Sequence, residues 1–89
     1  NKLQELQKIQ AHNKRVTSVC FNPKDQIFAS ASEDCTVKVW NLNGNELGVF
    51  RGHNQKVTSI CFSPNGQIVA SASEDRTVKL WSLNSKEVQ

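Results

Sequence analysis

The chain has 89 residues, of which 37% are apolar and 21% are charged, and its net charge is +3. It contains no apolar run long enough for a signal peptide or a membrane span, so we expect no association with a membrane. Its lysines and arginines are scattered and are not interleaved with aromatic residues, which argues against nucleic-acid binding.

The three cysteines favour a reduced, cytoplasmic protein. Their number is odd, and Cys20 and Cys61 occupy the same position in two similar halves of the chain. Neither Cys-x-x-Cys pairs nor paired histidines support a zinc site. We therefore expect small, buried, reduced thiols, no metal and no cofactor. The chain contains no methionine, not even an initiator, which favours an excised or processed piece.

The first segment, residues 5–10, is predicted to be a strand. Taken alone, Leu3, Leu6 and Ile9 among polar residues would also fit one face of a short helix. However, the sequence ELQKIQAH that starts at Glu5 matches ELGVFRGH further along the chain, where two glycines and a Val-Phe pair suit a strand. The match outweighs the local helical pattern.

Three predicted strands follow, and each of them occurs a second time further along the chain. The offset between the two copies is constant and equals the separation of Trp40 and Trp81. They are rich in β-branched and apolar residues, and the turn Ser-Pro-Asn-Gly after the second copy of the first strand is typical of a chain reversal. A fourth strand is complete only once. The predicted strands are Val16–Phe21 and Val57–Phe62, Ile27–Ser32 and Ile68–Ser73, residues 36–40 and 77–81, and Glu46–Arg51.

Two stretches of nearly identical sequence are the strongest motif: SASEDCTVKVW at residues 30–40 and SASEDRTVKLW at residues 71–81. Each follows a histidine, His12 or His53. Together with the constant spacing and the four strands per unit, they make the chain resemble the WD-repeat β-propeller family over nearly its whole length. The aspartate that usually follows the tryptophan in that family is replaced here by Asn41 and Ser82.

The resemblance implies an all-β fold with two four-stranded antiparallel propeller blades per chain. Residues 12–52 would form the first blade, and residues 53–89 the second, which lacks its own outer strand. Residues 1–11 would supply the outer strand that completes the last blade of a neighbouring chain. Because two blades cannot close a ring, we expect cyclic homo-oligomerisation to close the propeller.

The resemblance also implies a structural hydrogen-bond network within each blade, from tryptophan to serine to histidine to aspartate. Such a network would pin the strands in register. Ser32 and Ser73 lie on the same strand faces as the chosen serines, which leaves the choice of serine open. The two predicted sets are Trp40, Ser30, His12 and Asp34, and Trp81, Ser71, His53 and Asp75.

Serine, histidine and aspartate together could also indicate a hydrolase. We reject this interpretation because the trio occurs twice, comes with a tryptophan that can donate to the serine, and has no oxyanion-hole motif beside it. No catalytic residue and no enzymatic activity are therefore predicted.

Partner binding is what the resemblance implies as the function, on one rim of the propeller. The rim has no aromatic residue, so its composition also fits a solvated face of alternating charges. The main prediction is a non-catalytic, self-assembling building block, with a tetramer favoured over a trimer. The alternative is a fragment of a larger WD-repeat scaffold that binds a protein or peptide. The rim positions are Arg15, Thr17, Glu33, Lys56, Thr58 and Glu74.

Overall fold

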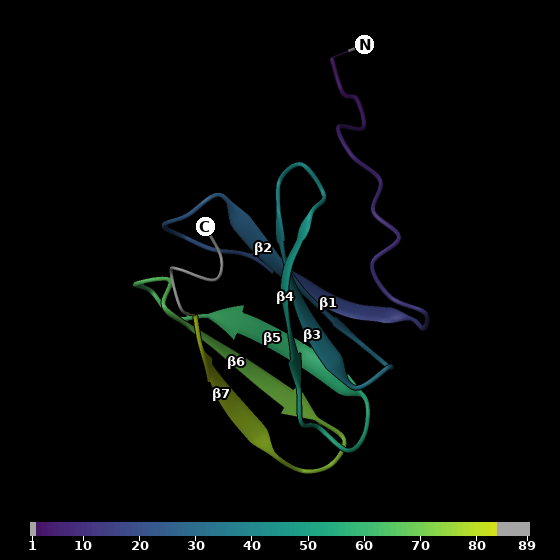
Figure 1. Cartoon of the computed structure of the whole chain (residues 1–89), viewed down its shortest axis with the longest axis vertical. Coiled ribbons are helices and arrows are strands. Elements are labelled where there is room, and N and C mark those ends of the chain that lie inside the picture. The colour runs from purple at the N-terminus through teal and green to yellow at the C-terminus, as the bar shows by residue number, and fades with distance from the viewer. Residues whose placement is uncertain (1, 84–89) are drawn as a thin grey trace.

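The computed structural model describes residues 2–83, which form two antiparallel sheets (Figure 1). The first sheet has four strands in chain order, and the second has three. The prediction of an all-β chain is confirmed. The strands are β1 (Val16–Phe21), β2 (Ile27–Ser32), β3 (Thr36–Asn41) and β4 (Glu46–Arg51), then β5 (Val57–Phe62), β6 (Ile68–Ser73) and β7 (Val78–Ser82).

Strand bounds agree with the sequence prediction except in the third strand of each sheet. β3 extends to Asn41 rather than ending at Trp40, and β7 runs from Val78 to Ser82 rather than over residues 77–81. Residues 84–89 lie outside the described residues. They include most of the turn predicted to start at Ser82 and the positions that would follow it, where the fourth strand of the second sheet would be expected.

The two sheets are built in the same register. In both, a bulge falls at the start of the first strand pair, next to Val16 in one sheet and Val57 in the other. The second and third strands pair from Ile27 opposite Asn41 and from Ile68 opposite Ser82. The repeat in the sequence is therefore a repeat of the whole sheet, including its irregularity.

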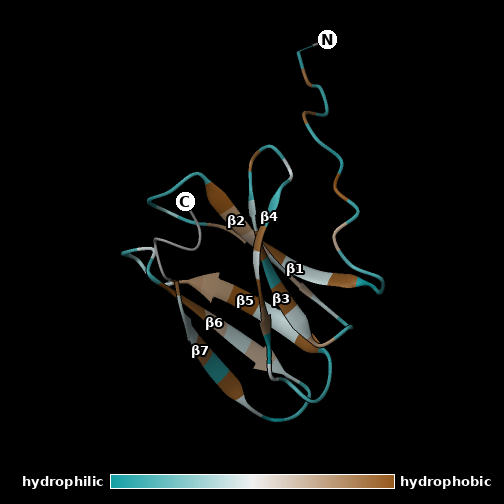
Figure 2. Cartoon of the chain, viewed as in Figure 1, coloured by the Kyte–Doolittle hydropathy of each residue, from teal (hydrophilic) through white to brown (hydrophobic). Residues whose placement is uncertain are grey.

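The core lies between the two sheets. Hydrophobic residues lie mainly on the strands, whereas the turns are mostly hydrophilic (Figure 2). Ala29 and Ala31 of β2 are completely buried, because only small side chains fit where β5 packs against β1 and β2. The core consists of Ile27, Ala29, Ala31, Val37 and Val39 from the first sheet and Val57, Ile60 and Val69 from the second.

Residues 2–11, here called the leading segment, form neither a helix nor a strand with their own chain. They begin away from both sheets at the N-terminus and then approach the first sheet, which the chain enters at β1 (Figure 1). The amide of Gln7 donates to the carbonyl oxygen of Asn43 at 3.1 Å, and Ile9 lies beside Gly44. The helical alternative is wrong. The predicted strand at residues 5–10 was expected to pair with a neighbouring chain, and that pairing stays a prediction.

The prediction of buried cysteines is wrong for all three. Cys20 and Cys35 are half-buried and Cys61 is exposed, and all are free thiols. Cys61 differs from Cys20 because it lies on the face of the second sheet that has no sheet packed against it among the described residues. Burial, and next the neighbouring Cys61 thiol, raises the pKa of Cys20, although a hydrogen bond from the backbone of Phe62 opposes this.

A buried asparagine joins the two sheets at one end. The side chain of Asn22 donates to the carbonyl oxygen of Gly66 at 2.9 Å, and its Oδ1 accepts hydrogen bonds from the backbone of Lys24 and Asp25. Gly66 has a positive φ of 75°, and a Cβ there would lie 2.5 Å from Asn22 Oδ1. The backbone conformation and the close approach of Asn22 therefore both require glycine.

We expect Gly66→Ala to lower the free energy of unfolding by about 2–3 kcal/mol, because it combines left-handed strain with a broken inter-sheet hydrogen bond. Gly48→Ala is the matched control, since a Cβ at Gly48 meets nothing within 4 Å. That control should change stability by about 0.5 kcal/mol or less. Urea unfolding followed by tryptophan fluorescence measures both, and equal effects would contradict the role assigned to Gly66.

Candidate functional site

The first sheet carries a continuous chain of hydrogen bonds. Trp40 Nε1 lies 2.9 Å from Ser30 Oγ, and Ser30 Oγ lies 2.8 Å from His12 Nε2. His12 Nδ1 lies 2.9 Å from Asp34 Oδ2. The indole N–H donates only, so Ser30 Oγ accepts from it, and the Ser30 hydroxyl is the group that can donate to His12 Nε2 when Nδ1 carries the ring proton. His12 then donates from Nδ1 to the aspartate.

The second sheet repeats this arrangement. The distances are 2.8 Å from Trp81 Nε1 to Ser71 Oγ, 2.7 Å from Ser71 Oγ to His53 Nε2, and 3.0 Å from His53 Nδ1 to Asp75 Oδ2. The structure thus brings together both predicted sets of four residues. In the described residues, no buried side-chain nitrogen or oxygen atom lacks a hydrogen-bond partner.

Strand register explains why these residues meet. Phe28 stands opposite Trp40 across β2 and β3, so the indole reaches Ser30, two residues further along the same face of β2. The second serine has a different task. Ser32 Oγ accepts a hydrogen bond from the backbone of Asp34 at 3.0 Å, and Ser73 does the same for Asp75. Ser30 and Ser71 therefore bind the tryptophans, whereas Ser32 and Ser73 stabilise the turns that follow β2 and β6.

Sequence reasoning missed two threonines of the network. Thr36 Oγ1 donates to Asp34 Oδ1 at 2.5 Å, and Thr77 makes the equivalent bond to Asp75. The signal was present, because Asp-x-Thr occurs in both copies of the repeated motif. Each threonine also lies 3.3 Å from Nδ1 of its histidine, so it closes the end of the network.

Both aspartates have lowered pKa values. For Asp34, burial acts to raise the pKa, but hydrogen bonds from Thr36 and His12 together outweigh it. For Asp75, the hydroxyl of Thr77 is the main cause of the lowered pKa, and the backbone of Asn54 and the ring of His53 add to it. Both side chains are therefore held as carboxylates that accept the last hydrogen bond of each network.

The network is built for holding strands and not for attacking a substrate. Ser30 and Ser71 are only 3% and 1% exposed, and each Oγ already accepts the indole N–H. A nucleophile needs both access to substrate and a free approach to its oxygen. Within residues 2–83, no cluster of three or more His, Cys, Asp and Glu could hold a metal ion. The same residues contain no helix that could cross a membrane.

The predicted rim residues lie along one end of both sheets and form a chain of alternating charges. Glu33 contacts Arg15 at 3.7 Å and Lys56 at 3.8 Å, and Lys56 also contacts Glu74 at 3.6 Å. The ion pair between Glu33 and Lys56 crosses from the first sheet to the second. Pairs this exposed contribute little to stability, typically about 0–1 kcal/mol each.

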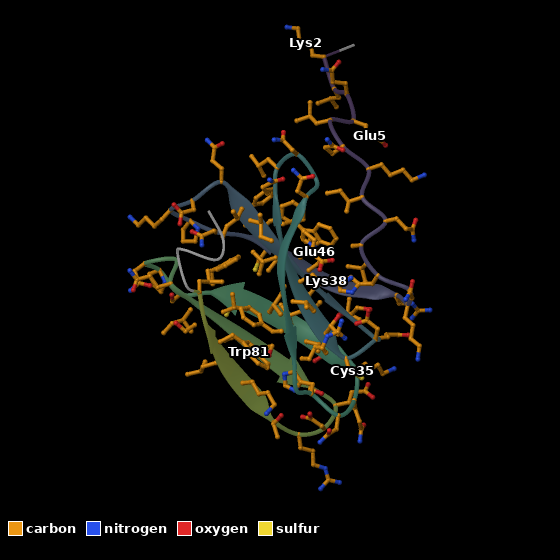
Figure 3. All side chains as sticks on the ribbon, viewed as in Figure 1. Lys2, Glu5, Cys35, Lys38, Glu46 and Trp81 are labelled. Carbon is orange, nitrogen blue, oxygen red and sulfur yellow. The ribbon has the colours of Figure 1, made fainter. Side chains whose placement is uncertain are left out.

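The two rim threonines donate to backbone oxygens. Thr17 Oγ1 donates to the carbonyl oxygen of Val57 at 2.6 Å, which joins β1 to β5 across the two sheets. Thr58 Oγ1 donates to the carbonyl oxygen of Ala72 within the second sheet at 3.3 Å. A further ion pair that the sequence did not predict joins Lys38 and Glu46 at 3.2 Å, on neighbouring strands β3 and β4 (Figure 3).

Removing the serine at the centre of a network should be costly. We expect Ser71→Ala to lower the free energy of unfolding by about 2–3 kcal/mol, because Trp81 and His53 each lose a partner. Ser59→Ala is the control, since Ser59 is exposed on β5 and its replacement should change stability by about 0.5 kcal/mol or less. Thermal unfolding of both variants tests this, and a Ser71→Ala variant as stable as the control would contradict it.

The lowered aspartate pKa values predict loss of stability in acid. The folded pKa values lie below the ordinary 3.8, so the contribution of the two carboxylates is present above about pH 4 and declines as the pH falls toward the folded values. Asp75→Asn should weaken this pH dependence, whereas Asp25→Asn, which removes an exposed carboxyl outside the network, should keep it. Urea unfolding between pH 7 and pH 3 measures the slope; an unchanged slope in Asp75→Asn would argue against this origin.

Comparison with known proteins shows that the sequence matches one family twice. The sequence model of the WD domain, G-beta repeat family (WD40), matches residues 3–41 and 44–82. Each match begins in the segment before a sheet, so the family repeat is offset from the sheets, which start at Val16 and Val57.

Curated relatives resemble single stretches of the chain. The LST8-1 subunit of the target of rapamycin complex from Arabidopsis thaliana is 43% identical over 47% of this chain. U3 small nucleolar RNA-associated protein 13 from Saccharomyces cerevisiae is 49% identical over 42%, and the periodic tryptophan protein 1 homolog from Drosophila melanogaster is 43% identical over 48%. The aligned parts span only 14%, 4% and 10% of those proteins. With two family matches that cover most of its length, the chain belongs to the WD-repeat family.

Proposed function

We propose that this chain is a non-catalytic, self-assembling WD-repeat building block, and that copies of it close head to tail into a β-propeller scaffold. WD-repeat proteins are generally non-catalytic scaffolds for protein interactions. The further claim, that the partner is a second copy of this chain, depends on one observation. The outward face of each sheet carries residues equivalent to those on the inward face of the other sheet, and these two inward faces pack together inside the chain.

The outward face of the first sheet, here called the leading face, carries Val16, Val19, Phe21 and Phe28. The residues at the equivalent positions of the second repeat pack on the first sheet and are buried or half-buried; they are Val57, Ile60, Phe62 and Val69. Val19 and Phe21 are instead 60% and 71% exposed. The leading face is therefore a packing face without its partner.

The outward face of the second sheet, here called the trailing face, carries Ile68, Ala70, Ala72, Val78 and Leu80. The residues at the equivalent positions of the first repeat form the first sheet's half of the core; they are Ile27, Ala29, Ala31, Val37 and Val39. Val78 and Leu80 are 68% and 70% exposed. Large exposed apolar faces of this kind mark interaction sites. The leading face and the trailing face carry residues equivalent to those of the two inward faces, so they can pack together in the same way.

The leading segment supports the same arrangement. β7 is the last strand of a three-stranded sheet, and the first sheet has β4 at the corresponding edge. Residues 5–10 share with β4 the Glu-Leu start and an apolar residue, Ile9 in place of Phe50. In the proposed assembly, these residues pair with β7 of the neighbouring copy and cover an edge that would otherwise attract other strands.

A repeated contact between unlike faces closes a ring by rotation. Propellers have about four to eight blades, so two blades per chain allow rings of two, three or four chains, and we favour the tetramer over the trimer. The cytoplasm, a reducing compartment, suits the three free thiols.

One alternative has support of its own. The aligned parts span 4% to 14% of the relatives named above, so the covering faces could belong to further repeats of a longer scaffold. In that case a protein or peptide would bind on the rim at Arg15, Lys56 and their neighbours. No nucleic acid or membrane is proposed as a partner in either case.

Light scattering after size-exclusion chromatography tests the proposal. We expect a particle of about four chains of 10.0 kDa, or of about three if the ring is a trimer. A folded, soluble sample with the mass of one chain would contradict self-assembly and favour the longer scaffold.

A shortened chain is the second arm of this test. Without residues 1–10, β7 would keep an open edge, so the expected result is aggregation or loss of fold. A soluble particle with an unchanged number of chains would contradict the strand exchange and leave the self-association through the sheet faces in place.

A further inference from the structure

We infer that the trailing face of one copy fills a specific apolar pocket on the next copy, and that the residues of this interface are matched in size to each other. This inference rests on the proposed self-assembly and specifies its contact.

The pocket lies between the leading segment and the first sheet. It has a volume of about 440 Å³, and its apolar walls are formed by Leu6 and Ile9 of the segment and by Phe21, Phe28 and Leu42. Leu6 and Phe21 are 85% and 71% exposed, so these walls lie open in the single chain. The pocket is large enough for several aliphatic side chains.

The same pocket exists inside the chain, where it is filled. The residues at the positions equivalent to its apolar walls all belong to the core or pack on it; they are Leu47, Phe50, Phe62, Val69 and Leu83. There the occupants are buried residues of β2 and β3, among them Ile27, Val37 and Val39. The equivalent occupants for the open pocket are Ile68, Val78 and Leu80, which are exposed on the trailing face. The open pocket and the open occupants therefore belong to the two ends of one chain.

The two interfaces differ at two positions where a ring and a smaller residue exchange places. Inside the chain, the strand that corresponds to the leading segment supplies a large ring, Phe50, and β6 supplies the small Val69. At the open pocket the order is reversed, because Ile9 is the smaller residue and Phe28 carries the ring. The occupant Val39 becomes Leu80, which is larger by one methylene group. Cores tolerate a coordinated exchange between neighbouring positions better than a change at one position alone.

The aromatic contacts show the same exchange. Phe50 stacks on Trp81 with ring centres 5.0 Å apart. On the leading face, Phe28 stacks on Trp40 at 6.5 Å. Each network tryptophan thus has a phenylalanine against its ring, but that phenylalanine comes from a different strand in the two sheets. In the proposed contact, Leu80 of the second copy lies against this reversed pair.

The charged rim residues at the two outward faces are also complementary, like those that meet inside the chain. Inside the chain, Glu33 of the first sheet contacts Lys56 of the second. Their equivalents at the open faces are Glu74 and Arg15, which have the same signs and are 49% and 79% exposed. A second copy placed like the second sheet would bring Arg15 toward Glu74 and continue the chain of alternating charges. Arg15 and Glu74 would serve orientation more than affinity.

Association measured by sedimentation equilibrium tests the inference. Leu80→Asp places a carboxylate into the pocket of the next copy, and because Leu80 is 70% exposed the substitution leaves the core of the single chain intact. We expect the association constant per contact to fall at least about 100-fold. Arg51→Asp is the control, since Arg51 is exposed at the end of β4 and its replacement should leave association unchanged.

A rescue experiment tests the size matching. Phe28→Val alone should weaken association about tenfold, because it leaves a cavity at the contact. Combining it with Ile9→Phe and Leu80→Val recreates the set found inside the chain, and most of the lost association should return. Circular dichroism of each variant establishes that the sheets are formed.

The outcomes separate the two proposals. A wild-type protein with the mass of one chain would overturn the proposed self-assembly. A wild-type oligomer that Leu80→Asp and Phe28→Val leave unchanged would overturn only this interface. Weakening by Phe28→Val without rescue in the triple variant would overturn the size matching.

Discussion

The packing of two sheets through a layer of small residues is the constraint on which this structure depends. Ala29 and Ala31 are completely buried between β2 and β5, and they let the sheets approach closely enough for Val37, Val39, Val57 and Val69 to fill the remaining space. A larger residue at either alanine would separate the sheets. Because the second sheet carries Ala70 and Ala72 at the same positions, it presents the same kind of surface outward.

The hydrogen-bond networks add what apolar packing lacks, namely a fixed register. A slip of one residue along β2 would remove Ser30 from both Trp40 and His12 and leave buried donors unpaired. His12 comes from before β1, so the network also fixes where the chain enters the sheet. The Ser-His-Asp order resembles a catalytic triad only in its residue types, because the tryptophan occupies the serine oxygen and burial closes the approach.

A chain built from repeats has no natural end, since every sheet needs a neighbour on each side. Within residues 2–83, four features lack such a neighbour: the two outward faces, the edge of β7 with which no strand pairs, and the leading segment, which lies outside both sheets. If copies of the chain associate, a single type of contact would cover both outward faces and pair the leading segment with the edge of β7. Ile9, Phe28 and Leu80 lie outside the core between the two sheets, so an exchange of ring and aliphatic residues among them leaves that core unchanged.

The sequence by itself determined the all-β class, the strands from β1 to β7 to within a residue and both sets of network residues, because a motif written twice at a constant spacing reports a unit that must fold the same way twice. The strand that it predicted at residues 5–10 does not form within the chain. It left open which serine meets the tryptophan, and it missed Thr36, Thr77 and the bond from Asn22 to Gly66. It also predicted one common burial for Cys20 and Cys61, although they differ. Only the tertiary structure decided these points. Equivalent residues of the two repeats have the same place within their sheets, but what packs against them differs. One copy of each packing face contacts the other sheet of the chain, and the other copy faces outward.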